Sequence, residues 1–221
     1  MYDPPEKDGA QKLALTPDQI EAALRKPLPG LTAQTRMAPI PDSLTRPPLQ
    51  RHPRQGGVLL LLYPYTQGGE LFLVLTRRTD TVADHKGQVS LPGGGLEPHD
   101  SSLIQTALRE TCEELGLCSD EVRILGALTP LYVPPSDFCI HPYVAYLAHR
   151  PLFVPQPREV AELLEVPLRN FLGEENIRVE ERIIRGGSFQ VPYFDACGHK
   201  VWGATAIVIS EFAAVVARVI P

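Results

Sequence analysis

Short apolar runs separated by turn-forming residues dominate the chain from Gly57 onward. Residues 58–65 (VLLLLYPY) and 70–78 (ELFLVLTRR) are rich in strand-forming residues, and the intervening TQGG is typical of a turn. The two runs therefore predict a β-hairpin. The same kind of pattern predicts further strands at 122–133, 139–149, 177–184, 189–194 and 201–209.

Helical periodicity occurs in fewer places. Apolar residues at helical spacing predict a helix that Asp100 caps and that Gly116 ends. Residues 159–172 predict one or two short helices, and residues 209–220 predict a closing helix. Because strands and helices do not alternate strictly, the pattern indicates an α/β protein of mixed α+β character, in which helices flank a mixed sheet.

The first 56 residues follow a different pattern. Residues 16–26 predict a short amphipathic helix, in which Thr16 is the N-cap and Gln19 completes a capping box. Seven prolines then follow between Pro27 and Pro53, and they exclude helix interiors and central strands. We therefore predict an N-terminal helix and a Pro-rich extended arm over the surface (1–56), followed by a compact domain (57–221).

Composition and charge narrow the function classes. With 43% hydrophobic and 21% charged residues among 221, the chain is typical of a globular domain. A net charge of −5 argues against a nucleic-acid partner, which would need clustered Lys and Arg. No apolar run approaches the roughly 20 residues that span a bilayer, so no membrane partner is expected. The four cysteines lack metal-site spacing, and we expect them to be reduced, in a cytoplasmic protein.

Three glutamates, Glu110, Glu113 and Glu114, lie close together near the end of the predicted helix, beside Arg109. At about 100° per residue they should converge on one spot, largely away from the buried face, and Arg109 can pair with Glu113. One interpretation is a solvated acidic face. However, the helix dipole disfavours negative charge in the last turn. The alternative, which we favour, is a site for a hard divalent cation such as Mg²⁺, because such ions take carboxylate oxygens.

The sequence RETCEELGL (109–117) resembles the second half of the Nudix box, and Pro92-Gly93-Gly94 resembles its opening glycine pair. Ser101 stands where the box expects a glutamate, with Asp100 beside it. A pattern of Gly93, Gly94, Glu97 and Asp100 before the helix is similar to the coenzyme A pyrophosphatase branch of the family.

A second motif of that branch is matched upstream of the glycines. The matching residues are Leu75, Thr76, Arg78, Thr79, Val82, His85, Gly87 and Leu91-Pro92-Gly93-Gly94. Two positions depart from it, because Ala83 replaces an arginine and Leu91 replaces a phenylalanine. The loss of a cation at Ala83 bears on how the 3′-phosphate of the coenzyme would be recognised. The resemblance runs from about Gly57 to Ile209.

The resemblance implies a Nudix-type α/β/α sandwich with a mixed β-sheet, and a metal-dependent hydrolase. The substrate would be coenzyme A or an acyl derivative, cut at its diphosphate to 3′,5′-ADP and phosphopantetheine. Alternatives are another nucleoside diphosphate derivative, such as ADP-ribose or NADH, or a non-catalytic nucleotide-sensing module. A small-molecule nucleotide diphosphate would thus be the partner, and a homodimer is left open.

The resemblance also assigns roles to individual residues. Mg²⁺ or Mn²⁺ would be held at Glu110, Glu113, Glu114 and the backbone of Gly94. The expected catalytic residues are these three glutamates with Arg109 and the remote Glu159, which would be a further ligand or the base. The expected substrate contacts are Arg78, His85, Gly93 and Gly94.

Overall fold

The computed structural model describes residues 15–45, 48, 52–67, 69–79, 87–118, 120–184 and 186–220. Its main sheet has eight strands, five of them in the order β3-β2-β1-β7-β5. These are β3 (Val89–Ser90), β2 (Leu71–Arg78), β1 (Arg54–Pro64), β7 (Phe138–Tyr146) and β5 (Arg123–Ala127). The other three strands are β4 (Gly93–Gly95) beside β1, β6 (Leu131–Val133) beside β7 and β8 (Val160–Pro167) beside β2.

The sheet is mixed, as the sequence predicts. Strands β1 and β2 form the expected antiparallel hairpin, with Leu62 opposite Leu73. Strand β1 runs parallel to β7 on its other side, and the remaining pairs in this sheet are antiparallel. Strand β1 is therefore central, and it carries the apolar run that starts at Val58.

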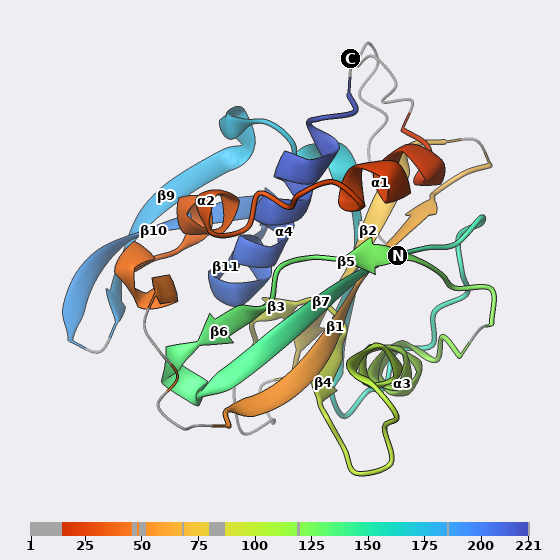
Figure 1. Cartoon of the computed structure of the whole chain (residues 1–221), viewed down its shortest axis with the longest axis horizontal. Coiled ribbons are helices and arrows are strands. Elements are labelled where there is room, and N and C mark those ends of the chain that lie inside the picture. Colours follow the sequence, from red (N-terminus) through yellow and green to blue (C-terminus); the bar gives the residue numbers. More distant parts are fainter. Residues whose placement is uncertain are drawn as a thin grey trace.

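Helices cover both faces of the main sheet (Figure 1). Alternate residues of a strand point to opposite faces. Leu59 and Leu61 accordingly share one buried cluster with Ala107 of α3 (Leu103–Leu115). Leu60 and Leu62 belong to a second cluster, on the side of α4 (Gly203–Val216) and α1 (Pro17–Leu24). Burial on both faces explains why β1 shows a continuous apolar run rather than an alternating one. The arrangement is an α/β/α sandwich.

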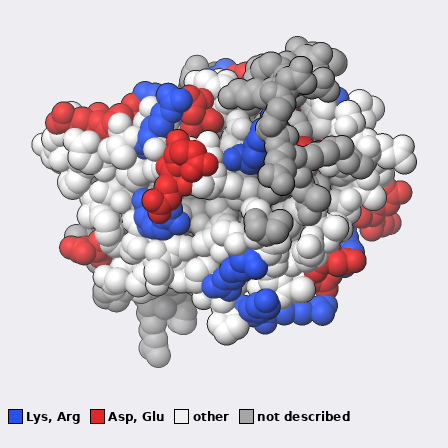
Figure 2. Space-filling model, turned by 90° about the horizontal axis from the view of Figure 1, so that it is seen from above, with Lys and Arg blue, Asp and Glu red and all other residues white. Residues whose placement is uncertain are grey.

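A second, three-stranded antiparallel sheet lies beside α4 (Figure 1). It consists of β9 (Ile177–Ile184), β10 (Gly187–Ala196) and β11 (His199–Trp202), in the order β11-β10-β9. On the molecular face shown in Figure 2, acidic and basic side chains lie next to one another rather than in one large basic patch. In the described part of the chain, no helix has the length and apolar character to span a membrane.

Two secondary-structure predictions are wrong. Residues 160–167 form strand β8 instead of a helix, followed by the 3₁₀ turn η4 (Leu168–Phe171), because β8 pairs with β2 along its length. Residues 203–209 begin helix α4 instead of ending a strand. Its β-branched residues favour a strand locally, but α4 is enclosed by the core, and such packing overrides propensity.

The N-terminal segment is only partly as predicted. Helix α1 has the expected capping box of Thr16 and Gln19. The prediction of an extended surface arm is wrong for residues 31–45, which form α2 (Leu31–Gln34) and the 3₁₀ turns η1 (Thr35–Met37) and η2 (Pro41–Thr45). This segment packs against the core, because Met37 is fully buried there. The division at residue 57 stays a prediction.

Glu211 of α4 anchors this segment to the core. Its carboxylate is fully buried and accepts hydrogen bonds from the Gly30 backbone N–H at 3.1 Å, from Gln34 Nε2 at 3.0 Å and from Thr129 Oγ1 at 2.6 Å. Gly30 and Gln34 thus contact a helical residue that lies more than 170 positions later in the chain. A buried carboxylate is tolerated when its oxygens are hydrogen-bonded in this way.

Replacing Glu211 by alanine should therefore destabilise the fold. Glu211→Ala leaves several buried donors without an acceptor, so we expect the free energy of unfolding in urea to fall by about 3 kcal/mol or more. The matched control is Glu174→Ala, because Glu174 also contacts the N-terminal segment, through Arg36, but is 87% exposed. It should change stability by less than about 0.5 kcal/mol. Equal losses in the two variants would contradict the anchoring role of Glu211.

Candidate active site

Helix α3 carries the glutamates, and its ends are defined by particular residues. The C-terminal prediction is confirmed, since Gly116 ends the helix in a left-handed conformation with φ 68°. The N-terminal prediction is wrong, because the N-cap is Ser102, whose hydroxyl accepts from the Gln105 backbone N–H at 3.3 Å. Asp100 instead accepts hydrogen bonds from the side chains of Thr106 and Arg109. Its carboxylate therefore binds side chains of α3 and does not cap the backbone N–H groups of the first turn.

Glycines let α3 pack directly against the backbone of the sheet. A Cβ at Gly57 of β1 would overlap the carbonyl oxygen of Leu103. A Cβ at Gly94 of β4 would overlap the carboxylate of Glu110. Because neither glycine has a side chain, the helix lies close to the sheet, and the Glu110 carboxylate lies against the β4 backbone. This close approach depends on Gly57 and on Gly94, the middle residue of the glycine triplet.

The three glutamates are not equivalent. The Glu114 residue is only 3% exposed, while the side chain of Glu110 is 15% exposed and that of Glu113 is 56% exposed. The prediction that all three point largely away from the buried face is therefore wrong for Glu114. Glu110 and Glu114, one turn apart, face the sheet, and Glu113 lies at the rim.

Glu114 is electrostatically unusual. Burial, together with the nearby carboxylates Glu110 and Glu159, raises the pKa of its carboxyl to about 8, against the positive charge of Arg78. The Gly93 backbone N–H donates to this carboxyl. Its Oε2 atom is buried and has no hydrogen-bond partner among the described residues. A buried polar atom without a partner is costly, so Glu114 is arranged to interact with a group other than the described residues.

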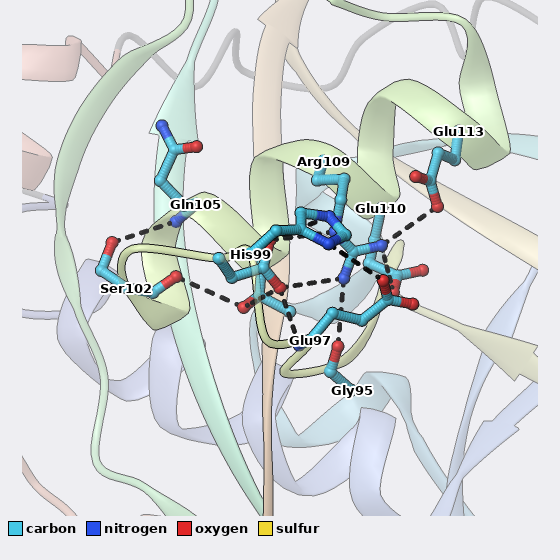
Figure 3. Close-up of polar contacts among 10 residues, drawn as sticks. Gly95, Glu97, His99, Ser102, Gln105, Arg109, Glu110 and Glu113 are labelled. Atoms are coloured by element: carbon cyan, nitrogen blue, oxygen red, sulfur yellow. Dashed lines mark hydrogen bonds and ion pairs between the residues drawn. The ribbon is translucent and has the colours of Figure 1, made fainter.

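Arg109 organises the acidic side chains around it (Figure 3). Its guanidinium contacts Asp100 Oδ1 at 3.0 Å, Glu110 Oε1 at 2.9 Å and Glu113 Oε2 at 3.1 Å. It also donates to the Gly95 carbonyl oxygen at 3.1 Å, which ties α3 to β4. Its hydrogen bonds hold the pKa of the Asp100 carboxyl well below its ordinary value. Burial raises the pKa of Glu110, and Arg109 opposes that rise. The predicted pairing of Arg109 with Glu113 is present.

Arg78, the last residue of β2, and Glu159, which directly precedes β8, both lie near the glutamates of α3. Arg78 lies opposite Val160 in the sheet, and the Thr79 backbone N–H donates to the Glu159 carbonyl oxygen at 3.0 Å. The segment before β8 is tied to the end of α3, because the Gln156 N–H donates to the Glu114 carbonyl oxygen at 2.8 Å. Glu159 therefore acts electrostatically on both Glu110 and Glu114.

The structure thus brings together most of the residues that the sequence singles out. Those gathered at one place are Arg78, Gly93, Gly94, Arg109, Glu110, Glu113, Glu114 and Glu159. His85 and Ala83 lie outside the described residues. The sequence interpretation missed Gly95 and the role of Asp100 in holding Arg109. Local patterns give no signal for contacts between positions nine and fourteen residues apart.

The donor set fits a hard divalent cation. Carboxylate oxygens and a backbone that can approach closely are the ligands such ions take, and Glu114 Oε2 lacks a partner in the described part of the chain. Within the described ranges, no three His, Cys, Asp or Glu side chains converge closely enough to enclose an ion unaided. Mg²⁺ commonly keeps water and substrate phosphate oxygens as ligands, so a partial protein set is compatible with it.

The expectation that all four cysteines are reduced is wrong. Cys112 of α3 is bonded to Cys118, with a Cα–Cα distance of 4.6 Å, whereas Cys139 is a free thiol. The left-handed turn at Gly116 reverses the chain and returns Cys118 to the last turn of the helix. The spacing of the cysteines in the sequence does not predict this disulfide, because the turn at the end of α3 brings Cys112 and Cys118 together.

Comparison with known proteins identifies the family. A NUDIX domain matches residues 53–183, more than half of the 221 residues. The chain belongs to the NUDIX domain family. The matched region contains β1, the glycine strand β4, helix α3 and the start of β8, and hence every site residue described above.

Several curated Nudix proteins are similar to the chain. Nudix hydrolase 22, chloroplastic, of Arabidopsis thaliana is 35% identical over 76% of this chain. Nudix hydrolase 15, mitochondrial, of the same plant is 34% identical over 78%. The alignments span 57% and 62% of these two relatives. The mitochondrial coenzyme A diphosphatase NUDT8 of Homo sapiens is 37% identical over 75% of this chain and 70% of its own length.

Solved Nudix structures share the fold. An Ap4A hydrolase from C. elegans, in a binary complex, superposes with a TM-score of 0.52 at 15% identity, covering 75% of this chain and 98% of its own. A MutT/nudix family protein from Enterococcus faecalis gives a TM-score of 0.51 at 18% identity, covering 85% and 73%. At these identities the likeness concerns the fold alone.

The raised pKa of Glu114 predicts a pH dependence of stability. A carboxyl whose pKa is about 8 when folded and about 4.5 when unfolded favours the folded state below pH 4.5, and this stabilisation is lost as pH rises to 8. In EDTA, the free energy of unfolding of wild type should therefore fall relative to Glu114→Gln between about pH 5 and 8, by a few kcal/mol. Urea unfolding at each pH measures it.

The control for this experiment is Glu113→Gln, which removes a carboxylate from an exposed position of the same helix turn. Its stability should follow that of wild type across the pH range. Parallel curves for wild type and Glu114→Gln would show that burial does not perturb Glu114 in this way.

Proposed function

We propose that the protein is a pyrophosphohydrolase that uses a divalent cation to hydrolyse the diphosphate bond of coenzyme A or an acyl-coenzyme A, giving 3′,5′-ADP and (acyl-)phosphopantetheine. The observation that carries the proposal is the buried Glu114 carboxylate, which has one oxygen without a partner among the residues that the structure describes and two further carboxylates, Glu110 and Glu159, acting on it. Close carboxylates with a buried member are costly without a positive charge to offset them, and a bound cation would supply it. Family membership supports the reaction class.

The cation would be held by Glu110 and Glu114, with Glu113 and the backbone of Gly94 as further ligands. Mg²⁺ or Mn²⁺ bound there neutralises diphosphate charge and polarises the attacking water. Arg109 is a positioning residue in this scheme, because it fixes Glu110 and Glu113 through its guanidinium and is itself fixed by Asp100. It also prevents the two glutamates from repelling each other before a cation binds.

The remaining groups would handle the substrate and the proton. Arg78 offers a guanidinium whose Nε is buried without a partner among the described residues, and it would fork onto phosphate oxygens. Glu159 is exposed and near Glu110 and the buried Glu114, so it would accept the proton of the attacking water or complete the cation site. In-line attack at one phosphorus would then expel the other phosphate as the leaving group.

Two features support the coenzyme A assignment within the family. The glycine and upstream motifs resemble the coenzyme A pyrophosphatase branch, and one similar protein is a human coenzyme A diphosphatase. Ala83, which stands where that branch has an arginine, predicts a modest rather than strong preference for the 3′-phosphorylated coenzyme.

Incubation with a panel of diphosphates tests this proposal. With Mg²⁺ or Mn²⁺, coenzyme A should give 3′,5′-ADP and phosphopantetheine, identified by mass, faster than ADP-ribose or NADH is cut. EDTA should abolish turnover. Faster cleavage of ADP-ribose would overturn the substrate assignment alone, whereas no cleavage of any diphosphate with either ion would overturn the reaction.

Removing single carboxylates tests the cation site. Glu113→Gln and Glu114→Gln keep side-chain size but remove an anionic ligand, so kcat should fall by on the order of a hundredfold or more at saturating Mg²⁺. Glu174→Gln, at an exposed and remote position, serves as the control and should keep wild-type turnover. If both site variants turned over like wild type, the ligand set would be wrong.

A further inference from the structure

A second site candidate lies away from the glutamates. A cavity of about 470 Å³, open to solvent, lies between the segment that leads into β3 and the strands β9 and β11. It is lined by Arg182, His199, Lys200 and Trp202, together with Gly87, Gln88, Val89 and Gly198. Strand β11 lies beside β3 in the fold (Figure 1), so the wall joins the two sheets. The proposed reaction uses none of these side chains.

The cavity carries a surplus of positive charge. Arg182 and Lys200 both form ion pairs with the single carboxylate of Glu180, which leaves one positive charge uncompensated within this group. The two cations lower the pKa of the Glu180 carboxyl. Lys200 is about half exposed, so its ammonium, with three N–H donors, can be shared with a ligand from solvent. An anion is the ligand that this charge favours.

The cavity also offers a flat aromatic surface. The Trp202 indole is partly exposed, and the Arg182 guanidinium lies 4.2 Å from the centre of one of its faces. Such a cation and ring pair is a good partner for a planar base, which can stack on either.

The cavity lies across one edge of the main sheet from the glutamates. Arg77 and Arg78 are neighbours in β2, so their side chains point to opposite faces. Arg78 acts on Glu114, whereas Arg77 Nε contacts Glu162 at 3.1 Å, and Glu162 contacts His199 Nε2 of the cavity wall at 3.2 Å. The Gln88 carbonyl oxygen, at the cavity rim, accepts from the Arg78 N–H at 3.0 Å. Strands β2 and β3 thus separate the two sites.

We propose that this cavity binds a nucleotide, with a phosphate monoester at Lys200 and Arg182 and the base against Trp202. The wall combines cations that would bind a phosphate with an aromatic ring on which a base would stack. The nucleotide is either the part of the substrate that carries the non-reacting phosphate or a separate nucleotide. Binding itself does not depend on the proposed reaction, and only the choice between the two sources rests on it.

Fluorescence of Trp202, the single tryptophan of the chain, reports on the cavity directly. In EDTA, where no hydrolysis is expected, adenosine 3′,5′-bisphosphate should change the emission saturably, and adenosine should bind at least about tenfold more weakly. Glu174→Gln, at an exposed position that belongs to neither site, should leave this titration unchanged. No saturable change with the bisphosphate, or equal binding of adenosine, would overturn the proposal.

Charge variants make the assignment specific. Lys200→Gln should raise the Kd for the bisphosphate about tenfold or more, whereas Glu180→Gln should lower it severalfold, because it removes the carboxylate that competes for both cations. A tighter complex is a result that loss of folding cannot mimic. The matched control is Arg178→Gln, at an exposed position of β9 that does not line the cavity. Wild-type affinity in both Lys200→Gln and Glu180→Gln would overturn the assignment.

Kinetics then separate the two sources of the nucleotide. If the cavity holds part of the substrate, Lys200→Gln should raise KM about tenfold for coenzyme A but not for dephospho-coenzyme A, with kcat unchanged. If it holds a separate nucleotide, both KM values should stay at wild-type levels while the bisphosphate still binds Lys200→Gln more weakly. Either result keeps the cavity as a nucleotide site.

Discussion

The close packing of α3 on the glycine backbone of β1 and β4 is the constraint on which the site depends. Gly57 and Gly94 leave no space for a side chain, so the helix lies against the sheet and Glu110 lies against β4. The segment before β8 contacts the last turn, because the Gln156 N–H donates to the Glu114 carbonyl oxygen, and Glu114 is buried there. The raised pKa of Glu114 and its unpartnered oxygen follow from that burial. Larger residues at either glycine would move the helix and disperse the carboxylates.

Arg109 makes this concentration of acids compatible with folding. It contacts Asp100, Glu110 and Glu113 at once, so a single, mostly buried guanidinium links three carboxylates, and its one positive charge offsets only part of their negative charge. Glu114 is outside this network and close to Glu110, with Arg78 as the cation that acts on it. The site therefore keeps a surplus of negative charge, and Glu114 is where we propose that a cation binds. The nucleotide cavity beside Trp202 would add recognition without adding to this charge.

Local signals in the sequence predict much of this architecture, because they act over a few residues. The hairpin of β1 and β2, the capping box at Thr16 and the helix end at Gly116 were all predictable from turn and cap chemistry. The burial of Glu114 was not, because helical periodicity treats acids as solvent-facing. Strand β8 and the start of α4 were mispredicted for a related reason, since their pairing and enclosure depend on distant residues. The same holds for Asp100, whose partner lies nine positions away.

Calorimetric titration of Mn²⁺ into the metal-free protein at pH 7 tests the central claim most directly. A carboxyl with a pKa of about 8 is mostly protonated at pH 7, so a cation that binds Glu114 must displace its proton. Titrations in buffers of different ionisation enthalpy should show nearly one proton released per ion bound in wild type. Glu114→Gln should bind Mn²⁺ much more weakly and release no such proton. Equal Mn²⁺ affinity and equal proton release in the two proteins would contradict the account.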